Sequence, residues 1–538
     1  MRSSTLAWAS TSLGLAILSS AQPTSGTSSV DQFISKLNVS PSVASAVKSA
    51  ISPCFPNGNA SSTTCSGPQL SALACNVNSI VFGSGNEYLN SSSPAYVSVI
   101  EHNWSEACWL DARCVVQPAS TQDVSRALLI TSYMGTTFSV RSGGHNPNPG
   151  FASNVGGTLI DLVNLNQIGL SKDGSYALVG PGNRFGAVLK ELDAKYQKSI
   201  VGGRIEDVGV GGYYLGGGMA FFSSRFGLAA NTIRNYEVVL PDGSIVNANA
   251  KKNADLFWAL KGGGPNFGIV TRYDINTVPA EKVWFEAFVY DPSQNEALLA
   301  AVVEYAKLAE ADEAAGLVFN LTPQGGLVGF IYGNATVRPP VYAPFYNITP
   351  SATYAPSTVG SWVDLADAFA GATDETPSNW MIVSIAHKWS LDALNESYAE
   401  WTKLAAQVAS SFNATLAFGV QPFTSTAVKN SNAAGGSPLG LEAVSQNWFT
   451  STIQWQGDGH DAEALAAIQS LGQTVADSSA KYGAALPFRF MNDANHAQDV
   501  FKSYGDSNLA RLRQIAAKYD PNGVMQKLQN DGWLLSKA

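Results

Sequence analysis

The sequence predicts an α+β protein built from two large parts. Between Trp109 and Asp274, short β-branched runs punctuated by glycine alternate with helical patterns, as in a sheet domain with interleaved helices. From Lys282 the strand patterns become longer, which is typical of an antiparallel sheet with helices on one face. The change of pattern predicts a second domain.

The composition indicates a large buried core and excludes two classes of protein. Hydrophobic residues make up 45% of the 538 residues and charged residues 14%, against about 25% charged in an average soluble chain, so intrinsic disorder is excluded. Lys and Arg number 32 against 41 Asp and Glu, a net charge of −9. Because no basic stripe can neutralise phosphates, we expect no nucleic-acid partner.

The N-terminus, residues 1–21, is predicted to be a secretory signal peptide. Arg2 precedes an apolar stretch from Leu6 to Leu18, and small residues follow up to Ala21, the order that signal peptidase reads. A membrane anchor is the alternative, but this stretch is shorter than the roughly 20 residues that span a bilayer. We expect a secreted protein with no membrane partner.

Nine Asn-x-Ser/Thr sequons support export and predict a glycosylated surface. The expected glycan acceptors are Asn38, Asn59, Asn90, Asn103, Asn320, Asn334, Asn347, Asn395 and Asn413.

All five cysteines lie in one early segment, which in an oxidising compartment predicts disulfide staples with one thiol left over. We favour Cys54 with Cys65 and Cys75 with Cys114, although sequence alone leaves the connectivity open.

The pattern places the elements of each part. In the N-terminal arm, residues 22–74, the apolar spacing over 30–51 is compatible with one short helix. In the next part, residues 75–281, we expect strands at 114–117, 137–141, 158–162, 176–179, 236–240 and 268–273, and helices at 121–134 and 184–196. In residues 282–490 we expect strands at 283–290, 316–321, 327–332, 381–389, 416–423 and 448–456, and helices at 294–311, 391–410 and 462–482. The tail, residues 491–538, should hold one helix at 508–519.

Several familiar motifs are excluded. Gly209 and Gly211 would need a glycine at 214 to form a dinucleotide fingerprint, but Tyr214 stands there. No Walker lysine and no nucleophile elbow is present. The five histidines are never within four residues of one another, so no helical metal pair exists and we expect no metal site.

Four glycine-dense segments remain: Arg141–His145, Val208–Gly212, Gly216–Gly218 and Gly262–Gly268. Glycine allows close backbone approach and positive φ, and backbone N–H groups in such loops can hold a pyrophosphate. Tight turns in a β-rich protein are the alternative for any one of them. Together they favour a large phosphate-bearing cofactor.

These segments resemble one family closely. Phe138-Ser-Val-Arg-Ser-Gly-Gly-His145, the block from Val208 to Gly218, the block from Phe257 to Thr271 and the tail block from Tyr519 to Gln526 are similar to FAD-linked oxidases of the vanillyl-alcohol-oxidase (PCMH-type) superfamily, of the fungal berberine-bridge-enzyme-like kind. The resemblance implies a two-part FAD domain, residues 75–281 with the return of 491–538, and a substrate domain over 282–490.

The resemblance also implies how the cofactor is held. His145 matches the histidine that the family joins to the flavin, whereas Ile205 stands where bicovalent relatives have cysteine, so we expect monocovalent FAD. The expected cofactor contacts are Arg141, Ser142, Gly143, Gly144, His145, Val208, Gly209, Val210, Gly211, Gly212, Gly217, Ile269 and Val270.

Catalytic residues follow from the same resemblance. Asn492 matches the family, while Asp493 replaces its common tyrosine and Tyr213 replaces a histidine of plant relatives; a substrate base must lie within hydrogen-bond reach of its proton. A solvated loop carboxylate is the alternative for Asp493. Candidates for the pocket in the second domain are His387, Trp389, Gln421, Phe423, Gln454 and Gln456, although alternation cannot say which face of the sheet points at the flavin.

The expected activity is oxidation of a small molecule. A hydride would leave a C–H bond next to oxygen or nitrogen of a secondary metabolite, and O2 would reoxidise FAD with release of H2O2. An oligosaccharide oxidase acting at the anomeric carbon is one alternative, although the single tether favours a metabolite. A flavin-binding protein without turnover is the alternative of another class.

Overall fold

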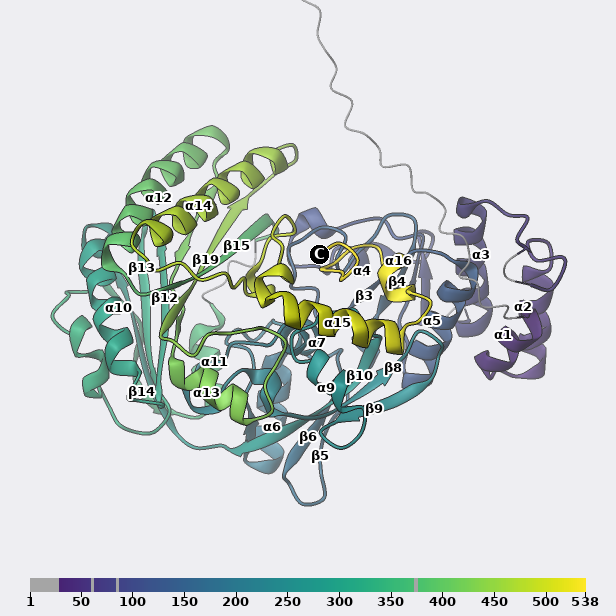
Figure 1. The fold of residues 1–538 in the computed structure, drawn as a ribbon, viewed down its shortest axis with the longest axis horizontal. Helices are drawn as coiled ribbons and strands as arrows, with labels where there is room; N and C mark the ends of the chain where they lie inside the picture. Colours follow the sequence, from purple (N-terminus) through teal and green to yellow (C-terminus); the bar gives the residue numbers. More distant parts are fainter. Residues whose placement is uncertain (1–28, 60–61, 84–86, 372–375) are drawn as a thin grey trace, which may run out of the picture.

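The computed structural model describes residues 29–59, 62–83, 87–371 and 376–538, and the predicted signal peptide lies outside these ranges. Two smaller sheets lie beside a large third sheet, and a helical arm extends at the far end (Figure 1). No helix in the described ranges is long and apolar enough to cross a membrane.

The arm contains three helices, α1 (Val30–Leu37), α2 (Pro41–Ile51) and α3 (Gly67–Phe82). The single helix predicted over 30–51 is therefore wrong. Asn38 ends α1 in the left-handed region at φ 49°, and Ser40 and Pro41 start α2, with the Ser40 side chain accepting from the backbone N–H of Val43. The arm packs against α5 (Thr121–Met134).

Both favoured disulfides are present: Cys54 is bonded to Cys65 inside the arm, and Cys75 of α3 is bonded to Cys114 of the following sheet. Cys108 is the free thiol and is buried. The arm is thus covalently joined to the part that follows it.

The first sheet carries the first glycine-rich loop. Its strand order is β1 (Tyr88–Asn90), β2 (Cys114–Val116), β4 (Thr158–Asp161) and β3 (Phe138–Arg141). The pairs β2–β4 and β3–β4 are parallel, so the chain crosses from β2 to β3 through α5. The loop that follows β3 therefore leaves the carboxyl edge of this sheet, where ligands of parallel sheets usually bind.

The second sheet is antiparallel. Its order is β5 (Ile168–Leu170), β6 (Tyr176–Val179), β10 (Ile269–Pro279), β8 (Ile233–Val239) and β9 (Ile245–Asn249), with β7 (Lys198–Ile200) paired to β10. Helix α6 (Phe185–Tyr196) packs against it, and the short helix α7 (Val210–Leu215) carries the second glycine-rich block.

The third sheet has nine strands. Along its main path the order is β14 (Ala352–Gly360), β11 (Val283–Tyr290), β13 (Gly325–Tyr332), β12 (Ala315–Thr322), β17 (Phe418–Gly419), β19 (Gln446–Trp455) and β15 (Asn379–Lys388). The strand predicted over 416–423 is wrong as a single element, because it is broken into β16 (Thr415–Leu416), β17 and β18 (Pro422–Phe423), each paired with β19. Strand β14 was not predicted. It carries Pro356, which fits the edge position where it lies.

Helices α10 (Asn295–Ala309), α12 (Leu391–Phe412) and α14 (Asp461–Lys481) cover one face of this sheet (Figure 1). Along β15, Met381, Val383 and Ile385 pack in the same core as these helices. The intervening residues Trp380 and Ile382 line the cavity on the opposite face. The structure thus settles the orientation that alternation left open.

The tail returns to the first sheet, as α15 (Asp506–Tyr519) and α16 (Val524–Lys527). Beyond α16 the chain runs alongside β3: the N–H of Phe138 donates to the carbonyl of Leu528 at 2.9 Å, and the N–H of Asn530 donates to the carbonyl of Phe138 at 2.7 Å. Residues 528–530 therefore extend the first sheet beside β3.

The sequons differ in accessibility. The exposed ones are Asn38, Asn320, Asn334, Asn347, Asn395 and Asn413, and Asn59 and Asn90 are half-buried. Asn103 is 3% exposed, and its side-chain amide donates to the carbonyl of Cys108 at 3.1 Å. The amide nitrogen of Asn103 is thus enclosed and engaged in the fold, which disfavours a glycan there, and the glycan at Asn103 stays a prediction.

Candidate active site

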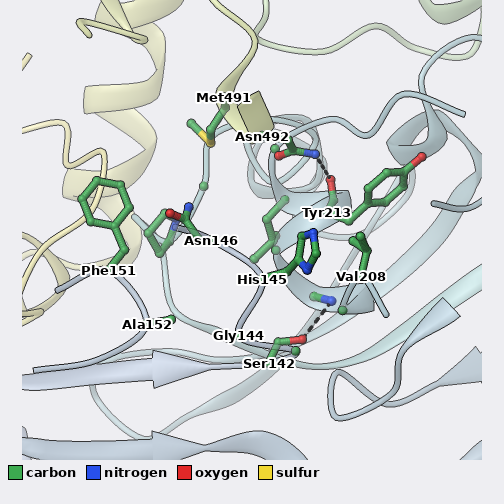
Figure 2. Close-up of a pocket in the computed structure, with 18 of the residues that line it drawn as sticks. Ser142, Gly144, His145, Asn146, Phe151, Ala152, Val208, Tyr213, Met491 and Asn492 are labelled. Atoms are coloured by element: carbon green, nitrogen blue, oxygen red, sulfur yellow. Dashed lines mark hydrogen bonds between the residues drawn. The ribbon is translucent and has the colours of Figure 1, made fainter. Parts of the chain in front are cut away.

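A cavity of about 520 Å³ lies between the glycine-rich loops, the open face of the third sheet and the C-terminal tail. This volume falls in the range of about 300–1,000 Å³ usual for cofactor and substrate sites. Figure 2 shows His145, Tyr213 and Asn492 near one another in it, with Val208 beside His145 and Ser142 below them. No group of three His, Cys, Asp or Glu side chains suited to a metal ion occurs in the described ranges.

The two glycine-rich loops touch through their backbones. A Cβ at Gly143 would lie 2.4 Å from the Cα of Gly209, and a Cβ at Gly209 would lie 2.5 Å from the Cα of Gly143. The Ser142 hydroxyl accepts from the N–H of Gly211 at 3.1 Å and donates to the carbonyl of Pro181. Glycine is required here by close approach, and the two loops form a cradle of closely packed backbone at the cavity wall, as glycine-rich loops that bind a pyrophosphate do.

Most of the predicted cofactor contacts line this cavity: Ser142, Gly143, Gly144, His145, Val208, Gly209, Gly211, Gly212, Ile269 and Val270. Arg141, Val210 and Gly217 do not. Arg141 is buried behind the loop, where it forms an ion pair with Asp161 at 2.9 Å. Val210 is 0% exposed in the core. Gly217, at φ 105°, packs against Leu439 instead.

His145 lies in an aromatic stack. Its ring stacks on Trp104 with centroids 4.5 Å apart, and Trp104 stacks on Trp380 of β15, also at 4.5 Å. Burial, helped by the charge of Arg184, lowers the pKa of His145 to about 4. The imidazole is therefore neutral at physiological pH and keeps a free lone pair on one ring nitrogen, as bonding to an electrophilic carbon requires. Ile205 also lines the cavity.

Asn492 belongs to a short 3-10 turn, Met491–Asp493, that enters the cavity from the tail side. Its amide donates to the carbonyl of Tyr213 at 3.0 Å (Figure 2). A Cβ at Gly216 would lie 1.6 Å from the Asn492 Oδ1, so the two segments are in close contact. Asn492 fixes this turn against α7.

Tyr213 is a weak candidate for the base. Its hydroxyl donates to the carbonyl of Gly202 at 3.0 Å, and its ring packs edge-on against Phe185 and Tyr214. Burial raises the pKa of Tyr213, which keeps the phenol protonated.

Asp493 faces a different environment. Its Oδ2 accepts from the Gln421 Nε2 at 2.7 Å, and the Gln421 Oε1 accepts from the guanidinium of Arg204. Burial raises the pKa of Asp493, although Gln421 and Arg204 oppose that effect. A half-buried carboxylate with a raised pKa inside a cavity has the properties of a general base.

The other residues proposed from the second domain divide into two groups. Gln421 contacts the cavity-lining residue Asp493. His387 is connected to Gln421 through Asn447, which contacts the His387 Nε2 at 2.9 Å and accepts from the backbone N–H of Gln421 at 2.8 Å. The remaining four, which do not line the cavity, are Trp389, Phe423, Gln454 and Gln456. Phe423 stacks on Trp448 in the core, with centroids 4.1 Å apart.

Sequence reasoning missed Trp104, Trp380 and Arg204, all of which line the cavity. The two tryptophans meet only through the fold. Arg204 stands immediately before Ile205, so proximity to the second glycine block was an available signal.

A two-loop glycine cradle with a neutral histidine beside it defines a flavin-linked oxidoreductase. Residues 112–249 match the FAD binding domain family. An FAD-dependent monooxygenase of Arthrobotrys oligospora is 39% identical over 469 residues, covering 86% of this chain and 90% of that protein. The FAD-dependent monooxygenase yanF of Aspergillus niger is 37% identical over 484 residues, covering 89% and 82%.

A solved structure shares the fold. It is the glucooligosaccharide oxidase of Acremonium strictum, described with a 6-S-cysteinyl, 8α-N1-histidyl FAD; its TM-score is 0.68 at 19% identity, over 83% of this chain and 97% of that chain. The chain belongs to the family of these FAD-dependent enzymes, which carry the FAD binding domain. FAD is its cofactor, and the cradle described above fits it.

Proposed function

We propose that the protein oxidises a secondary metabolite at a C–H bond next to oxygen or nitrogen, with O2 as the final acceptor and H2O2 as the second product. The observation that carries this proposal is the half-buried carboxylate of Asp493, which shares one cavity with His145 and the glycine cradle. The two relatives named as FAD-dependent monooxygenases support a small-molecule substrate.

In this proposal the residues of the site have separate roles. His145 would hold FAD through a single tether, and the flavin would supply the hydride acceptor and the route of two electrons to oxygen. Asp493 takes the proton from the substrate O–H or N–H, so that loss of the hydride from carbon leaves a C=O or C=N bond. Gln421 holds the carboxylate in place at 2.7 Å, and Trp104 and Trp380 supply a flat apolar wall.

Anaerobic mixing with candidate substrates, followed by the flavin absorbance, tests the proposal. Bleaching by a metabolite alcohol or amine, with one H2O2 and no ¹⁸O incorporation per product after O2 is admitted, would support it. Incorporation of one atom from ¹⁸O2 would show a monooxygenase instead, in keeping with the names of the two relatives. A colourless preparation, or one that no substrate bleaches, would indicate a binding protein.

An oligosaccharide oxidase is the second candidate, because the glucooligosaccharide oxidase fold covers 83% of this chain. Ile205 argues against it, since a doubly tethered cofactor leaves an open groove and no cysteine stands here. Rapid peroxide production from cello- or chito-oligosaccharides would favour this candidate over a metabolite oxidase.

We also propose that the protein is secreted and glycosylated. The signal sequence and the exposed sequons support this. The mature chain should begin near Gln22 and lose mass on endoglycosidase treatment. Unglycosylated intracellular protein in the native host would contradict the proposal.

A further inference from the structure

The cavity contains one unneutralised cation. Among the described residues that line it, Arg204 is the sole arginine or lysine, whereas Asp493 and Asp531 are carboxylates. Arg204 donates through one nitrogen to the Gln421 Oε1, and within the described ranges it forms no ion pair. A guanidinium has five N–H donors, so most of its donors remain unused beside the cavity.

Gln421 keeps Arg204 apart from Asp493. Its Oε1 faces the guanidinium, while its Nε2 donates to Asp493 at 2.7 Å and to the carbonyl of Trp448 at 3.1 Å. The backbone N–H of Gln421 donates to the side-chain oxygen of Asn447 at 2.8 Å. The orientation of the side-chain amide is thus fixed from both sides, and the two charged groups are held one amide apart, with no direct ion pair between them.

Arg204 lies on the side of the cavity that the third sheet forms. Its partner Gln421 lies between β17 and β18 of the third sheet, while the pyrophosphate cradle is built by the loops at Ser142–Gly144 and Gly209–Gly211. A cation beside the base therefore faces the molecule that the base deprotonates.

We propose that Arg204 binds an anionic oxygen of the substrate, a carboxylate or an ionised phenol or enol. This inference rests on the proposed function only in assuming that Asp493 and Arg204 meet the same molecule. The planar guanidinium can donate two parallel hydrogen bonds to such a group. The anion would orient the substrate so that its oxidisable carbon lies next to Asp493, which selects acidic metabolites over neutral sugars.

The test compares two matched probes, benzoate and benzamide, titrated into the holoenzyme at pH 7.5 and followed by the flavin difference spectrum. Wild-type protein should bind benzoate at least about 10-fold more tightly than benzamide. Arg204→Gln should weaken the binding of benzoate by about 10- to 100-fold, the usual effect of losing a charged hydrogen bond. It should leave the binding of benzamide unchanged. Arg204→Lys should retain part of the preference, because it keeps the charge.

Arg113→Gln is the matched control, because Arg113 is exposed and outside the cavity; it should bind both probes as wild type does. Thermal melting and the resting flavin spectrum check that each variant is folded and contains flavin. If Arg204→Gln does not fold or contains no flavin, the comparison is made with Arg204→Lys.

Equal binding of both probes by wild type, or unchanged benzoate binding by Arg204→Gln, would overturn the inference. So would a fall in flavin midpoint potential with the benzoate preference retained, because the cation would then act on the cofactor. The titration needs no turnover. A protein that binds benzoate through Arg204 but oxidises nothing would refute the proposed function alone, and one that oxidises substrates without any benzoate preference would refute this inference alone.

Discussion

Replacing Asp493 with asparagine removes the proposed base while preserving its shape. The amide oxygen of Asp493→Asn can still accept from the Gln421 Nε2, which donates at 2.7 Å in the wild type, so the turn should stay in place. A general base contributes about 10²- to 10⁴-fold, which corresponds to about 2.7–5.5 kcal/mol of activation free energy. We therefore expect flavin reduction to slow by at least about 100-fold, with the resting flavin spectrum unchanged.

The pH dependence gives this prediction a second readout. A base works only when unprotonated, and burial raises the pKa of Asp493. The rate of flavin reduction in the wild type should therefore rise with pH through a pKa above the value of about 3.9 of a solvated Asp. Asp493→Asn should lose this acidic limb.

Stopped-flow reduction under anaerobic conditions measures both effects. The matched control is Asp506→Asn, an exposed residue of the first turn of α15, which should reduce at the wild-type rate. Asn492→Ala is a contrasting variant: because its amide holds Tyr213 at 3.0 Å, it should change the flavin spectrum or substrate binding. An Asp493→Asn enzyme with wild-type rate and pH profile would refute the reasoning and return Asp493 to a structural role.

Three further changes test the cofactor site and the arm. His145→Ala should release flavin on acid precipitation, whereas the wild type retains it; flavin that stays with the variant would disprove the single tether. Gly209→Ala places a Cβ 2.5 Å from the facing backbone, so its ratio of flavin to protein absorbance should fall steeply, while Gly67→Ala, with no atom within 4 Å, should match wild type. Replacing both Cys75 and Cys114, which are 39 residues apart, with serine should lower the free energy of unfolding by about 4 kcal/mol, because the unfolded chain gains loop entropy. An unchanged melting temperature would show that this staple contributes little.

The sequence was most informative where chemistry restricts the residue type. The glycine blocks predicted close backbone approach, and Gly143 and Gly209 make that contact. The clustering of the five cysteines predicted disulfide staples with one free thiol, and the pairing that was favoured while the connectivity stayed open is the one observed. In both cases the physical constraint is local or belongs to a rare residue.

The tertiary contacts of the site could not be predicted from the sequence. Trp104 and Trp380 are far apart in the chain and meet only because β15 presents Trp380 to the cavity. Asp493 and Arg204 are related through Gln421 from a third segment. Periodicity predicts that a strand has two faces, but which face meets the cofactor depends on how the domains pack.

The pairing of the tail with β3 sets an order of events during synthesis. Strand β3 is flanked by Leu528 and Asn530, and the tail residues Met525, Gln529 and Trp533 form part of the cavity wall. Since about 400 residues separate the two segments, translation at about 5–20 residues per second leaves β3 without this neighbour for on the order of 20–80 s. The cavity is thus completed only after residues 525–533 have been made, and a nascent chain that stalls before them carries an open site.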